Sequence, residues 1–211
     1  MKKFVLLFLL FSLKLLAQQQ PATTDSLIWL QEPKGKVKTK TEVIKTKGEE
    51  LASHGFTAIT QHVSLVKDIP AGQLSTITFY FNSGLINLSK GEFGVEYKDT
   101  NFRLMMYDVA ANGMPGSLLT DTPLCFTVTK EHRGALDLDL SALNLQTQPQ
   151  LFIGMAAIDD HTTEQVVLKV RENKTALSYT KAKGSEEWTE YTDGSDFKFN
   201  IKMRVEVRAG E

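Results

Sequence analysis

The chain has 211 residues, of which 42% are hydrophobic and 23% are charged, and its formal net charge is −1. This composition is typical of a protein with a packed core and excludes a disordered chain of low hydrophobicity and high charge. A nearly neutral chain has no net basic field to attract phosphate backbones, so we expect no nucleic-acid partner. The length favours one large domain, since domains commonly have about 100 to 200 residues.

The first 17 residues have the pattern of a signal peptide. Lys2 and Lys3 precede an apolar run over residues 4–16, and Ala17 comes before a cluster of glutamines. The run is shorter than the roughly 20 residues that a membrane-spanning helix requires. We therefore expect an exported protein, periplasmic or extracellular, whose mature chain has no transmembrane segment.

Polar residues follow the signal peptide, and we predict a flexible leader over residues 18–33 and a single domain over residues 34–211. Lysines nearly alternate with other residues over 34–47, where Val43 and Ile44 also occur. This spacing favours an exposed edge strand, on which lysines discourage pairing with another chain. A patch that binds polyanions is the alternative interpretation.

Alternation of apolar and polar residues predicts strands from residue 56 onward. Ile77, Phe79 and Phe81 share one face of a predicted strand, and the run 197–208 alternates apolar and polar residues over its whole length. A helix does not explain this period, because every second residue would wind around the helix and leave no apolar stripe.

The run 151–158 is apolar on both faces and is predicted to be a central strand. A turn is expected at residues 112–116, which contain two glycines and a proline. Short strands with such turns and no long amphipathic helix predict an all-β fold. We expect a two-sheet antiparallel β-sandwich of the jelly-roll type.

Five segments of residues 74–158 carry a resemblance to a known family. They are Ile77-Thr78-Phe79-Tyr80-Phe81-Asn82, Phe102-Arg103-Leu104-Met105-Met106-Tyr107-Asp108, Gly113-Met114-Pro115-Gly116-Ser117-Leu118-Leu119, Leu136-Asp137-Leu138 and Leu151-Phe152-Ile153-Gly154. In their pattern and order they resemble bacterial secreted jelly-roll domains of the galactose-binding-like or carbohydrate-module type, which are often associated with carboxypeptidase-regulatory-like proteins. The resemblance implies a β-sandwich and transfers no site residue.

The densest group of metal-ligating side chains follows the predicted central strand and consists of Asp159, Asp160, His161 and Glu164. Oxygen ligands of this kind suit a structural calcium ion, the one cofactor that the sequence suggests. A solvated polar loop is the favoured alternative, because calcium takes six or more convergent oxygens and one loop rarely supplies them alone.

Three aromatic residues are the predicted ligand contacts. Trp188 and Tyr191 lie in a polar stretch, and Tyr179 is close in sequence. Partly exposed aromatic rings can stack on sugar rings, although packing at the edge of the sandwich is the alternative. Trp29 is expected to be a packing residue. The only cysteine, Cys125, lies in an apolar run and is expected to be buried as a small apolar side chain.

No motif of a nucleophile, a phosphate-binding loop or a dinucleotide site is present. We therefore expect an exported, non-catalytic binding or interaction module whose ligand is a glycan or a partner protein. One alternative is a secreted hydrolase that uses paired carboxylates. The other is a structural protein of the cell envelope that associates through strand edges.

Overall fold

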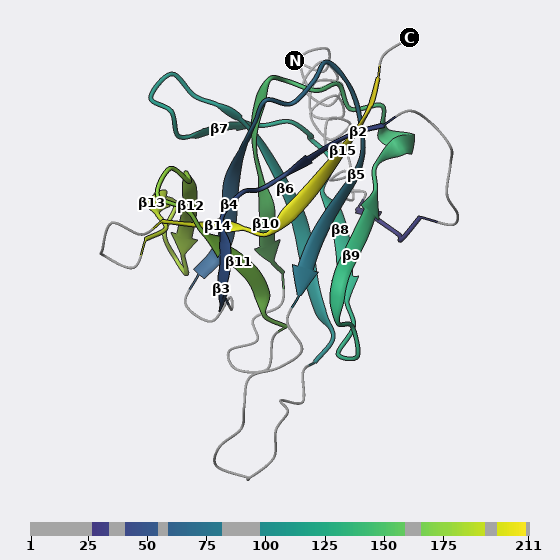
Figure 1. Cartoon of the computed structure of the whole chain (residues 1–211). Coiled ribbons are helices and arrows are strands. Elements are labelled where there is room, and N and C mark those ends of the chain that lie inside the picture. Colours follow the sequence, from purple (N-terminus) through teal and green to yellow (C-terminus); the bar gives the residue numbers. More distant parts are fainter. Residues whose placement is uncertain are drawn as a thin grey trace, which may run out of the picture.

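The computed structural model describes residues 27–33, 41–54, 59–81, 98–158, 166–192 and 198–209. Within these residues the chain forms two sheets that pack face to face as a β-sandwich (Figure 1). The predicted all-β, two-sheet fold is confirmed. The predicted signal peptide lies outside the described residues.

The first sheet has eight strands. In spatial order they are β1 (Ile28–Trp29), β8 (Leu124–Val128), β6 (Thr100–Val109), β10 (Gln150–Ala157), β4 (Ile59–Lys67), β12 (Ser178–Ala182) and β13 (Thr189–Glu190), and β7 (Pro115–Leu118) pairs with β6. The pairs in this sheet are antiparallel, apart from the parallel pair of β1 and β8.

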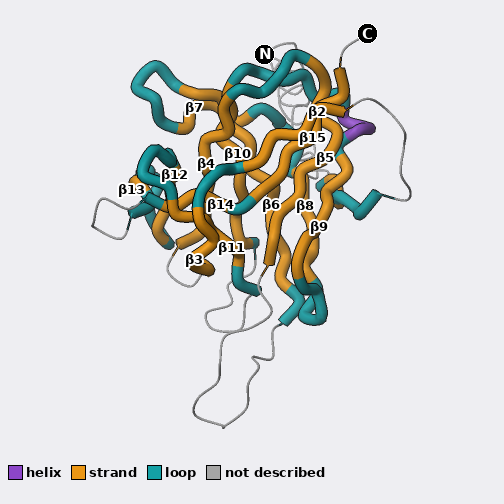
Figure 2. Tube along the Cα trace, in the orientation of Figure 1, coloured by secondary structure: helices purple, strands orange, loops and turns teal. Residues whose placement is uncertain are grey.

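The second sheet has seven strands. In order they are β14 (Phe199–Ile201), β11 (Leu168–Glu172), β5 (Gly72–Phe81), β15 (Met203–Ala209) and β2 (Thr41–Lys45), while β3 (Glu49–His54) pairs with β11 and β9 (Gly134–Asp139) pairs with β5. A short 3-10 helix, η1 (Ser141–Leu143), follows β9 (Figure 2). Helices with the length and apolar character to cross a membrane are absent from the described part of the chain.

Successive strands often lie in opposite sheets. The chain alternates between the sheets from β4 through β5 to β6, and again from β8 through β9, β10 and β11 to β12. In Figure 1, β15 crosses in front of β6 and β10. These connections are compatible with a jelly-roll-like domain.

The main core fills the space between the sheets, as the period-two pattern predicts. Ile77, Phe79 and Phe81 of β5 are at most 1% exposed. The Phe79 ring faces the Phe126 ring of the other sheet, with 6.1 Å between the ring centroids, and Phe126 stacks on Phe102 at 5.6 Å. Alternate residues of β9 and β15 are buried in the same core.

The predicted single strand over residues 197–208 is divided in its described part. β14 ends at Ile201 and β15 begins at Met203, and between them the Lys202 amide donates to the Lys169 carbonyl at 2.9 Å. β14 pairs with β11, whereas β15 pairs with β5 and β2. The alternating run thus forms two consecutive strands that pair with different partners.

β10 lies between β6 and β4, so the prediction of a central strand at 151–158 is confirmed. Gly154 is required for the close approach of β10 and β4. A Cβ atom at this position would lie 1.9 Å from the His62 carbonyl oxygen and 2.6 Å from the Val63 Cα. Backbone atoms cannot swing away as a side chain can, so alanine would force the strands apart.

Two further predictions concern the lysine-rich stretch and the cysteine. β2 is an edge strand of the seven-stranded sheet, as the lysine-rich stretch predicts, although Lys34, Lys36, Lys38 and Lys40 lie outside the described residues. On the opposite sheet, Cys125 of β8 is 1% exposed, as expected for a small apolar side chain.

Residues 27–33 form an extended segment, here called the arm, which contains β1. The amides of Ile28 and Leu30 donate to the carbonyls of Pro123 and Cys125 at 3.0 and 2.7 Å. Further along, the Gln31 carbonyl accepts from the Asp139 amide of β9 at 3.2 Å. The arm therefore connects an outer strand of one sheet with an outer strand of the other.

Candidate functional site

The eight-stranded sheet has a second apolar cluster, separate from the core between the sheets. On β6, Leu104 and Met106 belong to the main core, whereas Met105 and Tyr107 belong to the second cluster. Since successive side chains of a strand point to opposite faces, this cluster lies on the outer face of the sheet. Its buried members are Val63, Met105, Tyr107 and Phe152, and Leu65, Val109, Ala156, Tyr179 and Trp188 pack against them.

We call this set the outer cluster. Its four buried residues are between 0 and 7% exposed. Antiparallel sheets commonly keep one face polar and in contact with water. Apolar side chains on an outer face are therefore a feature that needs an explanation.

Aromatic rings meet edge to face within the outer cluster. The rings of Tyr107 and Trp188 have centroids 5.4 Å apart at an interplanar angle of 87°, and those of Phe152 and Tyr179 are 5.6 Å apart at 71°. Tyr179 comes from β12, and Trp188 comes from the connection between β12 and β13. Aromatic pairs favour such edge-to-face arrangements.

A tight turn brings Trp188 back over the sheet. After β12, the Ser185 amide donates to the Ala182 carbonyl at 3.1 Å, and Gly184 has a φ of 80° that favours glycine. The Glu187 amide then donates to the Ser185 hydroxyl at 3.1 Å. The turn returns the chain antiparallel beside β12, where β13 pairs with it, and the indole packs on the outer cluster.

Polar groups border the rings. The Tyr107 hydroxyl donates to Gln61 Oε1 at 2.9 Å. Lys181 Nζ lies 4.8 Å from the centre of the Trp188 ring and 3.1 Å from Glu186 Oε2. A cation at this distance from an indole face is attracted to its π electrons.

The Tyr107 hydroxyl is neutral over the whole physiological range. Burial raises the pKa of Tyr107 to about 12; the nearby charge of Arg103 lowers it, and that of Glu186 raises it further. Tyr107 therefore remains a hydrogen-bond donor to Gln61. The outer face thus offers apolar ring surface, an amide and two cations, which is a set suited to a ligand with both apolar and hydroxyl-bearing faces.

The structure brings together two of the three predicted ligand contacts. Trp188 and Tyr179 share the outer cluster. Tyr191 lies instead against the buried His62, at 4.6 Å between ring centroids, and against Phe199 of the other sheet at 5.6 Å. His62 alternates with the outward Val63, so Tyr191 packs on the inner side of the sheet, where burial raises its pKa.

The predicted calcium ligands, Asp159, Asp160, His161 and Glu164, lie outside the described residues. Among the residues that the structure does describe, no group of three or more histidine, cysteine, aspartate or glutamate side chains could hold a metal ion.

Sequence reasoning did not select Tyr107, Gln61 or Arg103. The signal that could have found Arg103 and Tyr107 is the outward face of β6, where Arg103, Met105 and Tyr107 alternate with apolar residues of the core, whereas Gln61 lies on β4. An arginine and a tyrosine beside a methionine on one face of a strand indicate a face that is neither fully buried nor fully exposed to solvent.

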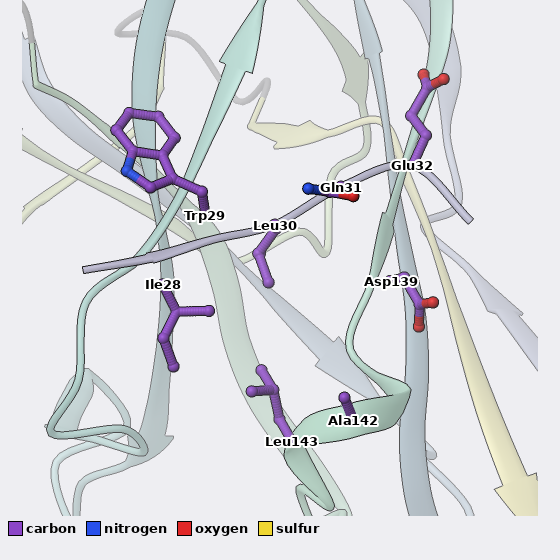
Figure 3. Close-up of a pocket in the computed structure, with 8 residues that line it drawn as sticks. All are labelled: Ile28, Trp29, Leu30, Gln31, Glu32, Asp139, Ala142 and Leu143. Carbon is purple, nitrogen blue, oxygen red and sulfur yellow. The ribbon is translucent and has the colours of Figure 1, made fainter. Parts of the chain in front are cut away.

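A groove of about 320 Å³ lies beside the arm (Figure 3). It is lined by Ile28, Trp29, Leu30, Gln31, Glu32, Asp139, Ala142 and Leu143. Figure 3 shows the side chains of Ile28 and Leu30 on one side of the arm and the Trp29 indole on the other. Trp29 is 50% exposed, so the prediction that it is a packing residue is wrong.

The chain matches no protein-family model, no curated protein and no solved structure.

Proposed function

We propose that the protein is a non-catalytic binding module that holds a glycan against the outer face of the eight-stranded sheet. The observation that carries this proposal is the outer cluster, where Trp188 and Tyr179 pack over apolar side chains beside Gln61 and Lys181. Sugar rings have apolar faces that suit aromatic side chains and hydroxyls that suit amides and charged groups.

The sequence supports the same proposal in two ways. Its N-terminal pattern predicts export, which would place the protein among extracytoplasmic glycans. The resemblance of residues 74–158 to galactose-binding-like and carbohydrate-module domains points to the same ligand class, and the sandwich is compatible with such a domain. A fold of this kind hosts many functions, so the proposal rests on the outer cluster.

A glycan array with the purified protein tests the proposal. We expect binding to one class of glycan, weakened at least about tenfold in Trp188→Ala and in Tyr179→Ala, because buried aromatic anchors dominate binding energy. Trp188→Phe retains an aromatic ring, so it separates loss of contact from loss of folding. Thermal unfolding of each variant checks that the fold persists.

The seven-stranded sheet supplies a matched control. Tyr80 lies on the outer face of β5 and has Lys202 Nζ 4.6 Å above its ring, much as Trp188 has Lys181. Tyr80→Ala should leave glycan binding unchanged. No binding to any glycan, or equal binding by the Trp188 and Tyr179 variants, would overturn the proposal, and hydrolysis of a bound glycan would overturn its non-catalytic part.

A further inference from the structure

A row of outward positions crosses the eight-stranded sheet. The register pairs Trp29 with Cys125, Cys125 with Arg103, Arg103 with Ala156, Ala156 with Gln61, and Gln61 with Lys181. Cross-strand partners share a face, so these residues lie on the face of the outer cluster. Five strand spacings make the row about 24 Å long.

Arg103 lies in the middle of this row between two small neighbours, Cys125 and Ala156. Its side chain is partly exposed. Among the residues that the structure describes, no side chain forms an ion pair or hydrogen bond with its guanidinium group. A guanidinium group presents a planar fork of donors that matches a carboxylate, so Arg103 is suited to an external anion.

The second cation of the row, Lys181, is held by a weak partner. Its ion pair is with Glu186, whose side chain is 97% exposed. Exposed ion pairs contribute little stability, so a ligand carboxylate could replace Glu186 at low cost. The face therefore complements negative charge even though the whole chain is close to neutral.

Aromatic side chains stand on both sides of Arg103. Trp29 is two strand spacings away, about 10 Å, and is half exposed. On the other side, Trp188 contacts Tyr107 and Lys181. Two positions from Arg103 along β6, Asn101 pairs with Thr127 of β8 on the same face. These residues add an amide and a hydroxyl group, and Thr127 Oγ1 donates to Asn101 Oδ1 at 2.7 Å.

We propose that the ligand of this face is an acidic glycan, a polysaccharide with uronic acid residues. One carboxylate pairs with Arg103, and the chain runs across the strands between Trp188 and Trp29. This inference rests on the proposed function, because it assigns the ligand class of the same face. It adds two residues, Arg103 and Trp29, that the outer cluster does not contain.

Polygalacturonate and alginate are suitable probes, compared with methyl-esterified polygalacturonate and with a neutral galactan in affinity electrophoresis or calorimetry. We expect at least one uronate polymer to bind about tenfold or more tightly than the esterified and neutral polymers. Arg103→Gln should abolish this preference, and Trp29→Ala should weaken uronate binding several-fold. Added salt should weaken the uronate complex more than any neutral one.

Arg133→Gln is the matched control, since it removes the same charge from the turn between β8 and β9, where Arg133 Nη1 donates to the Lys130 carbonyl at 2.6 Å. Arg103→Lys keeps a charge without the fork and should bind with intermediate affinity.

Equal binding of charged and esterified polymers, unchanged uronate binding by Arg103→Gln, or preference for a sulfated glycan without carboxylates would overturn this inference. If neutral glycans then bind in a manner that depends on Trp188, the proposed function stands without it. If no glycan binds at all, both fail.

Discussion

The two outer faces of the sandwich differ in what their strands present to the surroundings. On the seven-stranded sheet, the face carries ion pairs: Glu50 with Lys169 and Lys202, and Arg204 with Asp137 and Glu206. On the eight-stranded sheet, the same alternation places the apolar side chains of the outer cluster on the outer face. The period-two alternation thus determines which residues face outward. It does not determine whether water or a ligand contacts that face.

The charged face is already satisfied from within the chain. Arg204 reaches both Asp137 Oδ1 and Thr78, and the Thr78 hydroxyl donates to the same Asp137 oxygen at 2.6 Å. Such paired surface charges tolerate water and offer few unsatisfied groups to a ligand. The aromatic face has apolar surface and the guanidinium group of Arg103, which forms no ion pair within the described part of the chain, so ligand binding is expected on that side.

The largest expected effect comes from removing the centre of the outer cluster. Phe152→Ala should lower the free energy of unfolding by about 3 to 5 kcal/mol, because Phe152 is fully buried and a cavity would remain. Tyr80→Ala on the other outer face should cost about 1 kcal/mol. Urea denaturation of both variants measures the difference, and equal losses would show that the two faces are packed alike.

A smaller effect is expected from the Tyr107 hydroxyl. Tyr107→Phe should cost about 1 kcal/mol by removing the hydrogen bond to Gln61. The pKa of Tyr107 is raised to about 12, above its usual value of 10.0. The neutral phenol therefore stabilises the fold fully below pH 10, and this contribution is lost as the pH rises toward 12.

Urea denaturation at pH 8 and at pH 11 tests the linkage. The wild type should lose more stability between these values than Tyr107→Phe does, because only the wild type has the Tyr107 hydroxyl. Burial also raises the pKa of Tyr191, but Tyr191 is present in both proteins and its contribution cancels. An equal loss in the two proteins would show that the Tyr107 hydroxyl is not buried as described.

The smallest effect is expected on the charged face. Hydrogen bonds from Lys169 and Lys202 lower the pKa of Glu50 to about 2, from 4.5. The ion pairs stabilise the fold above pH 4.5, and this contribution is lost as the pH falls toward 2. Solvent screening limits it to about 0.5 kcal/mol, because the Glu50 side chain is 35% exposed.

Glu50→Gln should therefore have a stability that depends less on pH between 5 and 2.5 than that of the wild type. Glu186→Gln removes a carboxylate from the aromatic face and is the charge-matched control for this measurement. A wild type and a Glu50 variant with the same acid profile would show that these ion pairs are not formed in solution.

The candidate site could be predicted in part from the sequence. The polar stretch around Trp188 and the nearby Tyr179 indicated partly exposed rings, and both belong to the outer cluster. Tyr191 carries the same sequence signal but turns inward to His62. Trp188 and Tyr191 flank the two-residue strand β13, which is too short for an alternation pattern to show the face on which each ring lies. The local sequence therefore could not distinguish the outward Trp188 from the inward Tyr191.

The orientation of Trp29 in the arm could not be predicted from the local sequence either. Trp29 is predicted from the sequence to be a packing residue, yet Leu30 packs against the core and Trp29 is 50% exposed. The choice follows from the parallel pairing of Ile28–Trp29 with β8, in which the paired residues are 96 positions apart in the chain. A slip of one residue would have exchanged the two side chains.

By itself, the sequence determined the strands, their buried faces, the central position of residues 151–158 and the burial of Cys125, because these depend on the local pattern of apolar and polar residues along one segment. Only the tertiary structure decided that Arg103 has Ala156 on one side and Cys125, with Trp29 beyond it, on the other. Strand order and register are set by contacts between distant segments, which no local pattern encodes. The face on which a ligand is expected is made by those contacts.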